Sequence, residues 1–345
     1  MALIGAPDVA PTPPAPGRGR VLGPGARFTV SRLLSSLGTL VFVILFNFFL
    51  FRLLPGDPVA LYTRGRDVDP EIRRQMQARF NAPIAEQFVQ YLKNPFVPEL
   101  PSQQFSIPVW DVIVPRIGPT LLLVGTATVL ATVLGVWLGV RSAWKRGERF
   151  DRVATTTTLV LYSMPEFWFG MILLIVFSVG AFGLPGIFPV GGLSSPGVDV
   201  GTFAGLADVA WHLVLPVFTL TVIYLAEYAL VMRASLIDEM GQDYLQTARA
   251  KGLRDADVRR RHAVPNAMLP TTTLIFLNLG FVIGGAITIE YVFSLPGLGS
   301  LTVQALRGPD IPLLQTLFLL FSAAVILANL VADLLYARLD PRVRT

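Results

Sequence analysis

The chain has 345 residues, of which 53% are hydrophobic and only 15% are charged. Soluble domains carry about 25% charged residues, so this composition predicts a protein that crosses a membrane several times. The absence of cysteine excludes disulfides, thiol nucleophiles and cysteine-ligated metals. The net charge of +5 does not indicate nucleic-acid binding, because the basic residues are grouped between long apolar segments, as membrane topology requires.

Residues 1–28 are rich in proline, glycine and alanine and show no hydrophobic period. Such a segment cannot bury a core, so we expect a disordered tail. The apolar run Leu33–Leu54 is longer than the roughly 7–15 apolar residues of a signal peptide, and no small-residue cleavage site follows it. We therefore expect a retained first membrane helix and treat residues 29–345 as one membrane domain.

A membrane-spanning helix needs about 20 predominantly apolar residues. The segments that meet this requirement are Leu33–Leu54, Pro119–Val140, Val153–Phe177, Trp211–Met232, Leu269–Phe293 and Leu313–Tyr336. They predict an all-α integral membrane protein with six transmembrane helices. The fifth segment contains Asn278 and several glycines, which allow helices to pack closely in lipid.

The distribution of basic residues predicts the orientation of these segments. Arginine and lysine cluster in the loop after the second segment, in the loop after the fourth and in the C-terminal tail, whereas residues 178–210 contain none. Cytoplasmic loops carry the excess of basic residues, so we expect both termini in the cytoplasm. Residues 55–116 are then extracytoplasmic, and their arginines do not oppose this, because long loops translocate largely regardless of charge.

The extracytoplasmic segment, 55–116, is too short for a catalytic domain, and we expect a small lid or docking element. Residues 69–80 have helical character, with Asp69 in position to cap the helix and Pro70 at its start. Apolar residues at roughly helical spacing supply a small packed face. The alternative is that this segment only packs on the ends of the membrane helices.

The loop between the fourth and fifth segments, 234–264, has a pattern that its basic charge alone does not explain. The residues that recur every four positions, on one side of a helix, are Met240, Tyr244, Ala248 and Gly252. The small residues Ala248 and Gly252 would let another surface approach the backbone, and a glycine suits the end of a helix. Acidic residues shortly after the glycine favour a second short helix. The pattern predicts a docking surface, although the arginine run 259–261 by itself is explained by topology.

The stretch Gln242–Leu253 resembles the cytoplasmic coupling loop of ABC importer permeases. Further stretches are similar to the permeases of dipeptide, oligopeptide and nickel importers, in particular the B-type partner: Arg52–Pro58, Ser163–Trp168, Gly284–Gly299 and Asp333–Arg344. Together these resemblances cover residues about 30 to 344. The chain departs from the family's pattern at Gln246 and Thr247 of the loop, and at 98–101, where the family commonly has Gly-Asp-Leu-Gly.

The resemblance implies that the chain forms half of the translocation pathway of an ATP-driven peptide importer in the bacterial cytoplasmic membrane. It implies a second, homologous permease as heterodimer partner, two cytoplasmic ATPase subunits and an extracytoplasmic solute-binding protein. ATP and Mg would be bound by the ATPase subunits, and this chain would need no cofactor, metal or catalytic residue of its own. The residues implied in ATPase coupling are Asp243, Tyr244, Leu245, Thr247, Ala248, Ala250, Lys251, Gly252 and Leu253.

The sequence does not favour an enzyme, because it contains no phosphate-binding loop, no zinc-protease motif and no hydrolase nucleophile motif. Nickel chelates and glutathione are the alternative substrates within the resembled family, although two separated histidines and no cysteine do not select nickel. The alternative from another class is a stand-alone channel or secondary carrier, for which the sequence shows no convincing inverted repeats.

Ionisable groups at membrane depth are costly and mark functional sites. Glu166, Glu227 and Glu290, with the amide of Asn278, are therefore our candidates for the pathway. Glu166 lies deepest and would attract the amino terminus of a peptide, whereas Glu227 fits a gate, an internal ion pair or a packing role. For Glu290 and Asp333 the structural alternative is stronger, because each lies near a segment end, where a carboxylate can brace a helix.

Overall fold

The computed structural model describes residues 24–53, 81–98, 100–181 and 185–339, with a few isolated positions between these ranges. Every regular element in this part of the chain is a helix. The helices in it that are long and apolar enough to span a membrane by themselves are α1 (Pro24–Arg52), α5 (Val109–Trp144), α8 (Phe203–Met240) and α14 (Ile311–Leu339). The all-α membrane architecture is thus confirmed. Helix α1 begins inside the predicted tail 1–28, the rest of which lies outside the described residues.

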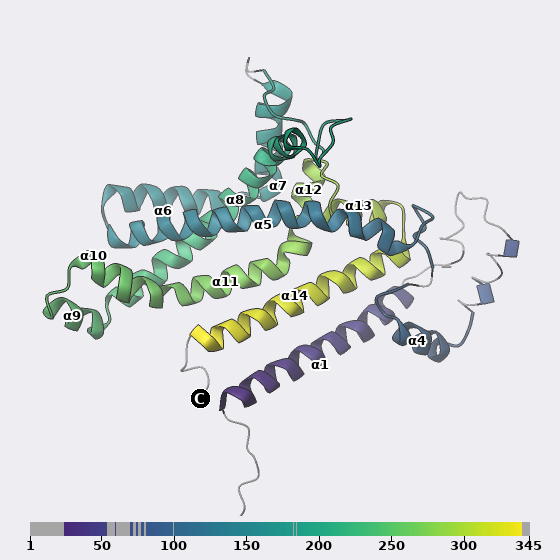
Figure 1. Cartoon of the computed structure of the whole chain (residues 1–345), viewed down its shortest axis with the longest axis horizontal. Helices are drawn as coiled ribbons and strands as arrows, with labels where there is room; N and C mark the ends of the chain where they lie inside the picture. Colours follow the sequence, from purple (N-terminus) through teal and green to yellow (C-terminus); the bar gives the residue numbers. More distant parts are fainter. Residues whose placement is uncertain are drawn as a thin grey trace, which may run out of the picture.

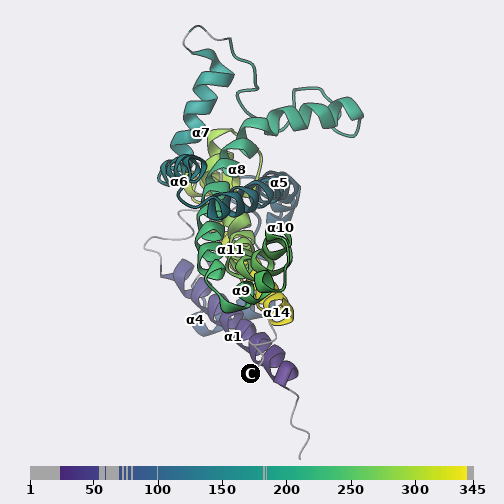
Figure 2. The ribbon, with the colours of Figure 1, turned by 90° about the vertical axis from the view of Figure 1, so that its left-hand side faces the viewer.

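Helices α1, α5, α11 (Val264–Gly285) and α14 run roughly along one axis of the molecule (Figure 1), whereas the first part of α8 turns across it (Figure 2). Helix α14 contacts both α1 and α11, and α11 in turn contacts α5 and α8. Short elements occupy the two ends of this bundle (Figure 1). The helices at one end are α9 (Asp243–Ala250), α10 (Asp255–Asp257) and the π-helical η2 (Val258–Ala263); α4 (Ile84–Lys93) and α13 (Leu298–Arg307) lie at the other.

The third predicted segment, Val153–Phe177, is not one helix. The chain forms α6 (Arg149–Tyr162), then α7 (Glu166–Leu174) continued by the π-helical η1 (Ile175–Gly180), and the two parts meet at 95°. Pro165 explains the break, because its ring disfavours helical backbone in the preceding residue and it has no N–H to donate. Figure 2 shows that α7 points away from the axis of the bundle.

The fifth predicted segment, Leu269–Phe293, is also divided. Helix α11 ends at Gly285, and the short α12 (Ile287–Val292) follows after Ala286. In the described part of the chain this segment does not qualify as a long apolar span, so four spans, or five with the bent α6–α7 pair, are present where six were expected. Of the predicted external helix at 69–80, only the positions 70, 71, 74, 77 and 78 belong to the described residues.

Helices α5 and α8 share the most extensive helix contact in the described part of the chain, and two glycines permit it. A Cβ atom added at Gly135 would lie 2.9 Å from the carbonyl oxygen of Leu225, and one added at Gly139 would lie 2.7 Å from that of Ala229. Small residues four apart are the usual means by which membrane helices bring their backbones together. The buried side chains Leu220, Leu123 and Val124 continue this contact into the central core.

We predict that Gly139→Ala destabilises the protein, because the added methyl group overpacks the interface at a cost of roughly 1–3 kcal/mol. Thermal unfolding in mild detergent should show a lower midpoint. The matched control is Gly125→Ala in the same helix, where an added Cβ meets nothing within 4 Å. That control should keep or raise the midpoint, because alanine is the better helix former. Equal midpoints for both variants would contradict the close α5–α8 contact.

Candidate coupling surface and intramembrane polar cluster

Helix α9 of the predicted coupling loop is anchored on the chain's own core by one face. Leu245 is fully buried and Ala248 nearly so, and both pack in a cluster with Met232 and Leu236 of α8. The small side chain of Ala248 therefore packs within this chain, and its contact with another protein stays a prediction. The exposed members of the predicted coupling set are Asp243, Tyr244, Thr247, Ala250, Lys251, Gly252 and Leu253.

Gly252 ends α9 in the way its sequence position predicted. Its φ of +80° is in the left-handed region that glycine tolerates best. Its N–H donates to the carbonyl of Arg249 at 2.9 Å, and the N–H of Leu253 donates to that of Ala248 at 3.3 Å. These two bonds form a Schellman motif, which satisfies the last carbonyls of the helix and turns the chain toward α10.

Tyr244 connects α9 to the two membrane helices on either side of the loop. Its hydroxyl bonds to the Glu239 carboxylate at the end of α8, lies 3.2 Å from the carbonyl oxygen of His262 and accepts from Asn266 Nδ2 at 2.8 Å. Burial raises the pKa of Tyr244 most, and the hydrogen bond with Glu239 raises it further. The hydroxyl therefore keeps its proton at neutral pH. One side chain thus joins α9, α8 and the start of α11.

The ion pair between Asp151 and Arg233 was not predicted from the sequence. Arg233 donates from Nε at 2.6 Å and from another guanidinium nitrogen at 2.9 Å, so the pair is bidentate and joins α6 to α8. Asp151 is buried and also accepts from the N–H of Gly147 at 2.9 Å. The two residues are 82 positions apart, and the sequence signal was only an acidic residue within a basic loop.

Glu290 binds the start of a neighbouring helix, α13, which is the structural role that the sequence analysis considered for it. Its side chain is fully buried, and it accepts from Thr120 Oγ1 at 2.6 Å and from the N–H groups of Gly299 and Ser300 at 2.7 and 3.0 Å. A carboxylate at a helix N-terminus satisfies N–H groups that have no partner within the helix. A Cβ at Gly297 would lie 2.2 Å from this carboxylate, so the glycine is needed there. Glu290 does not meet the other pathway candidates.

Asp333 pairs with Arg32 at 3.4 Å and joins α14 to α1. A structural role was the stronger alternative for this carboxylate too. Both side chains are partly exposed, so the pair contributes little to stability by itself. The pair links two helices that contact each other.

The remaining pathway candidates meet in one place, which we call the polar cluster: Glu166, Tyr224, Glu227, Tyr228 and Asn278. Asn278 Nδ2 donates to Glu227 Oε2 at 3.0 Å and to the Tyr228 hydroxyl at 3.2 Å, and so joins α11 to α8. Tyr224 lies next to Tyr228, with ring centroids 6.4 Å apart, and both Glu166 and Glu227 lie within electrostatic reach of it. Glu166 also accepts a hydrogen bond from Thr288 of α12.

The polar cluster is only half-buried. Glu166, Tyr224, Glu227 and Asn278 keep part of their surface accessible, whereas Tyr228 is fully buried. Sequence reasoning found the carboxylates and Asn278 but missed both tyrosines, because an aromatic residue within an apolar segment carries no signal of its own. The arrangement provides two carboxylates that can pair with a positive charge, and several hydrogen-bonding groups, within the membrane domain.

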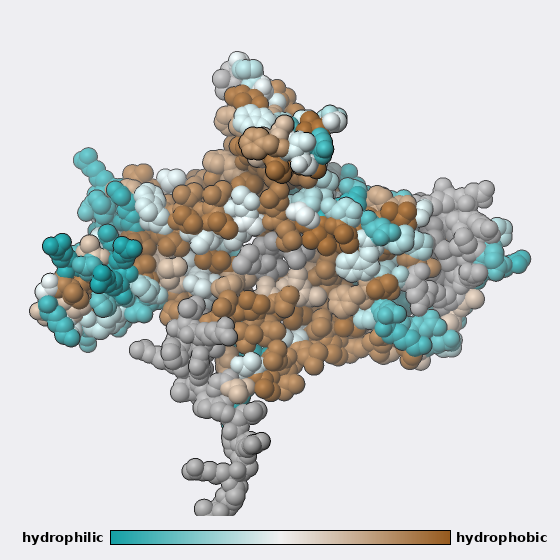
Figure 3. All heavy atoms as spheres, in the orientation of Figure 1, coloured by the Kyte–Doolittle hydropathy of each residue, from teal (hydrophilic) through white to brown (hydrophobic). Residues whose placement is uncertain are grey.

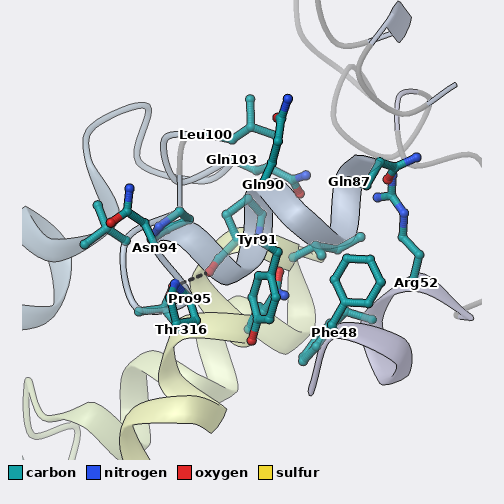
Figure 4. Close-up of a pocket in the computed structure, with 16 residues that line it drawn as sticks. Phe48, Arg52, Gln87, Gln90, Tyr91, Asn94, Pro95, Leu100, Gln103 and Thr316 are labelled. Carbon is teal, nitrogen blue, oxygen red and sulfur yellow. Dashed lines mark hydrogen bonds between the residues drawn. The ribbon is translucent and has the colours of Figure 1, made fainter. Parts of the chain in front are cut away.

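A cavity of about 130 Å³ lies far from this cluster, at the opposite end of the molecule from α9 (Figure 4). It is bounded by the end of α1, by α4 and by the start of α14. Phe48 of α1 contacts the rings of Phe88 and Tyr91 of α4, and Asn47 donates to the Tyr91 hydroxyl at 3.3 Å. Helix α4 therefore packs on the ends of membrane helices, which is the alternative considered for the extracytoplasmic segment.

Two family models match the chain. The model of the binding-protein-dependent transport system inner membrane component matches residues 131–345, and the model of the N-terminal part of such membrane components matches residues 26–123. The first match includes α9, the polar cluster and the whole of α8.

Curated relatives cover almost the same length. The dipeptide transport system permease protein DppB of Escherichia coli K12 is 36% identical over 338 residues, which cover 92% of this chain and 98% of the relative. The oligopeptide transport system permease protein AppB of Bacillus subtilis is 33% identical, with coverage of 92% and 99%. The glutathione transport system permease protein GsiC of an Escherichia coli O6:H1 strain is 36% identical, with coverage of 92% and 98%. The chain therefore belongs to the family of binding-protein-dependent transport system inner membrane components.

Proposed function

We propose that this chain is a permease subunit of an ATP-driven peptide importer and forms half of its translocation pathway. The observation that carries the proposal is the coupling loop: α9 is held on the ends of α8 and α11 by one face and leaves the other face accessible at the end of the bundle. Relatives named as dipeptide and oligopeptide permeases support peptides as the substrate class. Membership in a binding-protein-dependent family argues against a stand-alone channel or carrier.

The proposed complex contains a second homologous permease, two cytoplasmic ATPase subunits and an extracytoplasmic solute-binding protein. The ATPases bind ATP and Mg. In this proposal the chain has six spans, with α6–α7 and α11–α12 as its two divided segments, and both termini are cytoplasmic. Residues 55–116 then face the binding protein, and residues 234–264 contact the ATPases.

The proposed mechanism begins when the ATPases close on ATP and displace α9. The displacement reaches α8 through the buried contacts of Leu245 and Ala248, and it reaches α11 through the hydroxyl of Tyr244. The bidentate Asp151–Arg233 pair makes α6 follow α8. The helices thereby shift between two arrangements whose populations depend on how tightly each binds the ATP-closed ATPases.

Substrate selection is proposed to involve the two carboxylates of the polar cluster. A peptide with a free amino terminus carries a positive charge, which Glu166 and Glu227 attract. Glutathione is itself a small peptide with a free amino group, so it fits the same chemistry and stays the alternative substrate supported by a relative. Among the described residues no group of three His, Asp or Glu side chains is placed to hold a metal, so no feature of this part favours nickel.

Ala250→Arg tests the coupling surface. Ala250 is exposed on α9, so the arginine leaves the fold intact but obstructs a close-packed partner. We expect the variant to insert in the membrane normally, to lose co-purification of the ATPases by at least about tenfold, which corresponds to about 1.4 kcal/mol, and to lose peptide uptake. The control Glu148→Arg adds positive charge at an exposed site outside the loop and should behave as wild type. Full uptake by Ala250→Arg would refute the assignment.

Tyr244→Phe tests the connection between α9 and the membrane helices. The ring is kept while the hydroxyl is removed, which weakens the contact by roughly 1–3 kcal/mol. The ATPases should still co-purify, but the number of peptides imported per ATP hydrolysed in proteoliposomes should fall several-fold. Tyr162→Phe removes an exposed hydroxyl of α6 and is the matched control. An unchanged ratio of import to hydrolysis would show that the hydroxyl does not transmit motion.

Glu227→Gln tests the attraction of a peptide amino terminus. The amide keeps the side-chain volume but removes the charge, so import of free dipeptides should fall about tenfold relative to import of the same dipeptides with an acetylated amino terminus. Asp333→Asn removes a carboxylate whose partner is Arg32 and should leave this ratio unchanged. Equal losses for free and acetylated dipeptides would assign Glu227 to packing.

A further inference from the structure

One side of α5 carries an exposed apolar stripe that ends in an arginine. Val129, Val133 and Trp137 follow one another at every fourth position, and Arg141 is the next residue in this series. The apolar members are 63%, 63% and 56% exposed, so the described chain leaves most of their surface uncovered. Figure 3 shows hydrophobic residues along the middle of α5 and α6, and hydrophilic residues at the end where these two helices join.

Arg141 is held between two aromatic rings. Its Cζ atom lies 5.6 Å from the ring centre of Trp137 and 5.1 Å from that of Phe150, at the start of α6. A guanidinium group that stacks on rings by its face still has the N–H groups of its edge to donate. Arg141 is exposed, so this edge can reach a ligand at the surface of the bundle.

Two further arginines lie beside this stacked one. Arg149 and Arg152 are three positions apart at the start of α6, on the same side of that helix, and both are exposed. The carboxylates of the loop have other partners, because Glu148 pairs with Lys145 at 3.1 Å and Asp151 is buried against α8. Within the described residues, no carboxylate lies within ion-pair distance of these two arginines or of the stacked one. The surface therefore has three positive charges and lacks an anion.

Membrane topology explains why this loop is basic, but it does not explain the order of the residues. Orientation needs positive charge anywhere in the loop, whereas here a ring-stacked arginine completes an apolar stripe and two more lie next to it. A phospholipid has the matching order, since its acyl chains are apolar and its phosphate binds the planar fork of an arginine. Basic pockets between membrane helices on the cytoplasmic side bind lipid headgroups in this way.

We propose that Trp137, Arg141, Arg149 and Arg152, which we call the arginine site, bind an anionic phospholipid. Its phosphate lies on the arginines, and an acyl chain follows the stripe toward Val129. A headgroup with net negative charge, such as phosphatidylglycerol, is favoured over one with an ammonium group, because the carboxylates of the loop are already paired. The inference rests on the proposed function only in that the proposed orientation places the site in the cytoplasmic leaflet.

Photo-crosslinking of the full complex tests this site, in nanodiscs of phosphatidylethanolamine with phosphatidylglycerol as the minor lipid. Val133→p-benzoylphenylalanine places the reactive group on the stripe. Its adducts should contain phosphatidylglycerol at least about tenfold above the share of this lipid in the nanodisc. Phe46→p-benzoylphenylalanine, at an exposed position of α1, is the control and should reproduce the bulk composition. Adducts with a protein subunit, or bulk composition at both positions, would overturn the proposal.

Charge removal separates the site from the general charge of the loop. Combined with the crosslinker at 133, Arg141→Gln and Arg149→Gln should each lower the enrichment about fivefold. The second of these variants removes no ring-stacked side chain, so its effect does not depend on the stacking. Arg146→Gln removes the same charge from the turn between the two helices and should leave the enrichment nearly unchanged. Equal losses in all three variants would show attraction by net charge alone and would overturn the site.

A soluble competitor distinguishes a lipid from a phosphate ion. Glycerol phosphate has the same anion without acyl chains, so it should not displace the lipid adduct at 133. Displacement would show that the arginines bind a phosphate ion, and it would overturn the lipid. None of these measurements requires transport, so their failure leaves the proposed function standing. A wild-type complex that fails to import peptides would overturn that function and leave the lipid site in place.

Discussion

Two glycines of α5 bring its backbone against that of α8, and the functional elements depend on this contact because they are all attached to α8. Its residues Tyr224, Glu227 and Tyr228 form most of the polar cluster. Toward one end, Arg233 holds α6 and the buried side chains of the coupling loop pack in the same cluster of apolar residues. Toward the other, buried residues of α8 pack in one cluster with Leu173 of α7. The same helix, Phe203–Met240, therefore carries both the polar cluster and the contacts of the coupling loop.

Buried carboxylates stabilise the places where the chain leaves regular helix. Glu290 satisfies the first N–H groups of α13 just after the break between α12 and α13. Asp151 binds the backbone of Gly147 in the turn between α5 and α6 as well as Arg233. Each is surrounded by hydrogen-bond donors, as a buried charge requires. These two carboxylates bond to groups of this chain's own turns and helix ends, whereas the surroundings of Glu166 and Glu227 are more open.

The sequence predicted what local patterns control. Hydropathy located the four long spans, and the glycine at 252 with the acidic residues after it located the end of α9 and the start of α10. It did not predict the 95° bend, although Pro165 was visible, because a single proline in an apolar run also fits a kinked helix. Nor could it predict that Leu245 and Ala248 turn inward or that Asp151 meets Arg233, since these depend on contacts between residues far apart in the chain.

The unequal strength of the contacts along α8 indicates where the two arrangements of a transport cycle would differ. At the coupling end, α8 is joined to its neighbours by a bidentate ion pair with the buried Asp151, by fully buried apolar packing and by the bonds of the exposed Tyr244. Losing the ion pair leaves a buried carboxylate without its partner. At the polar cluster, α8 and α11 are joined through the amide of Asn278, and its bond to Glu227 is half-accessible. Water, or a peptide amino group, can replace such a bond at small cost. In the proposed mechanism, motion of α9 would therefore pass to the part of α8 that it contacts and would separate the helices at Glu227 and Asn278, where a substrate would take over the hydrogen bonds that are lost.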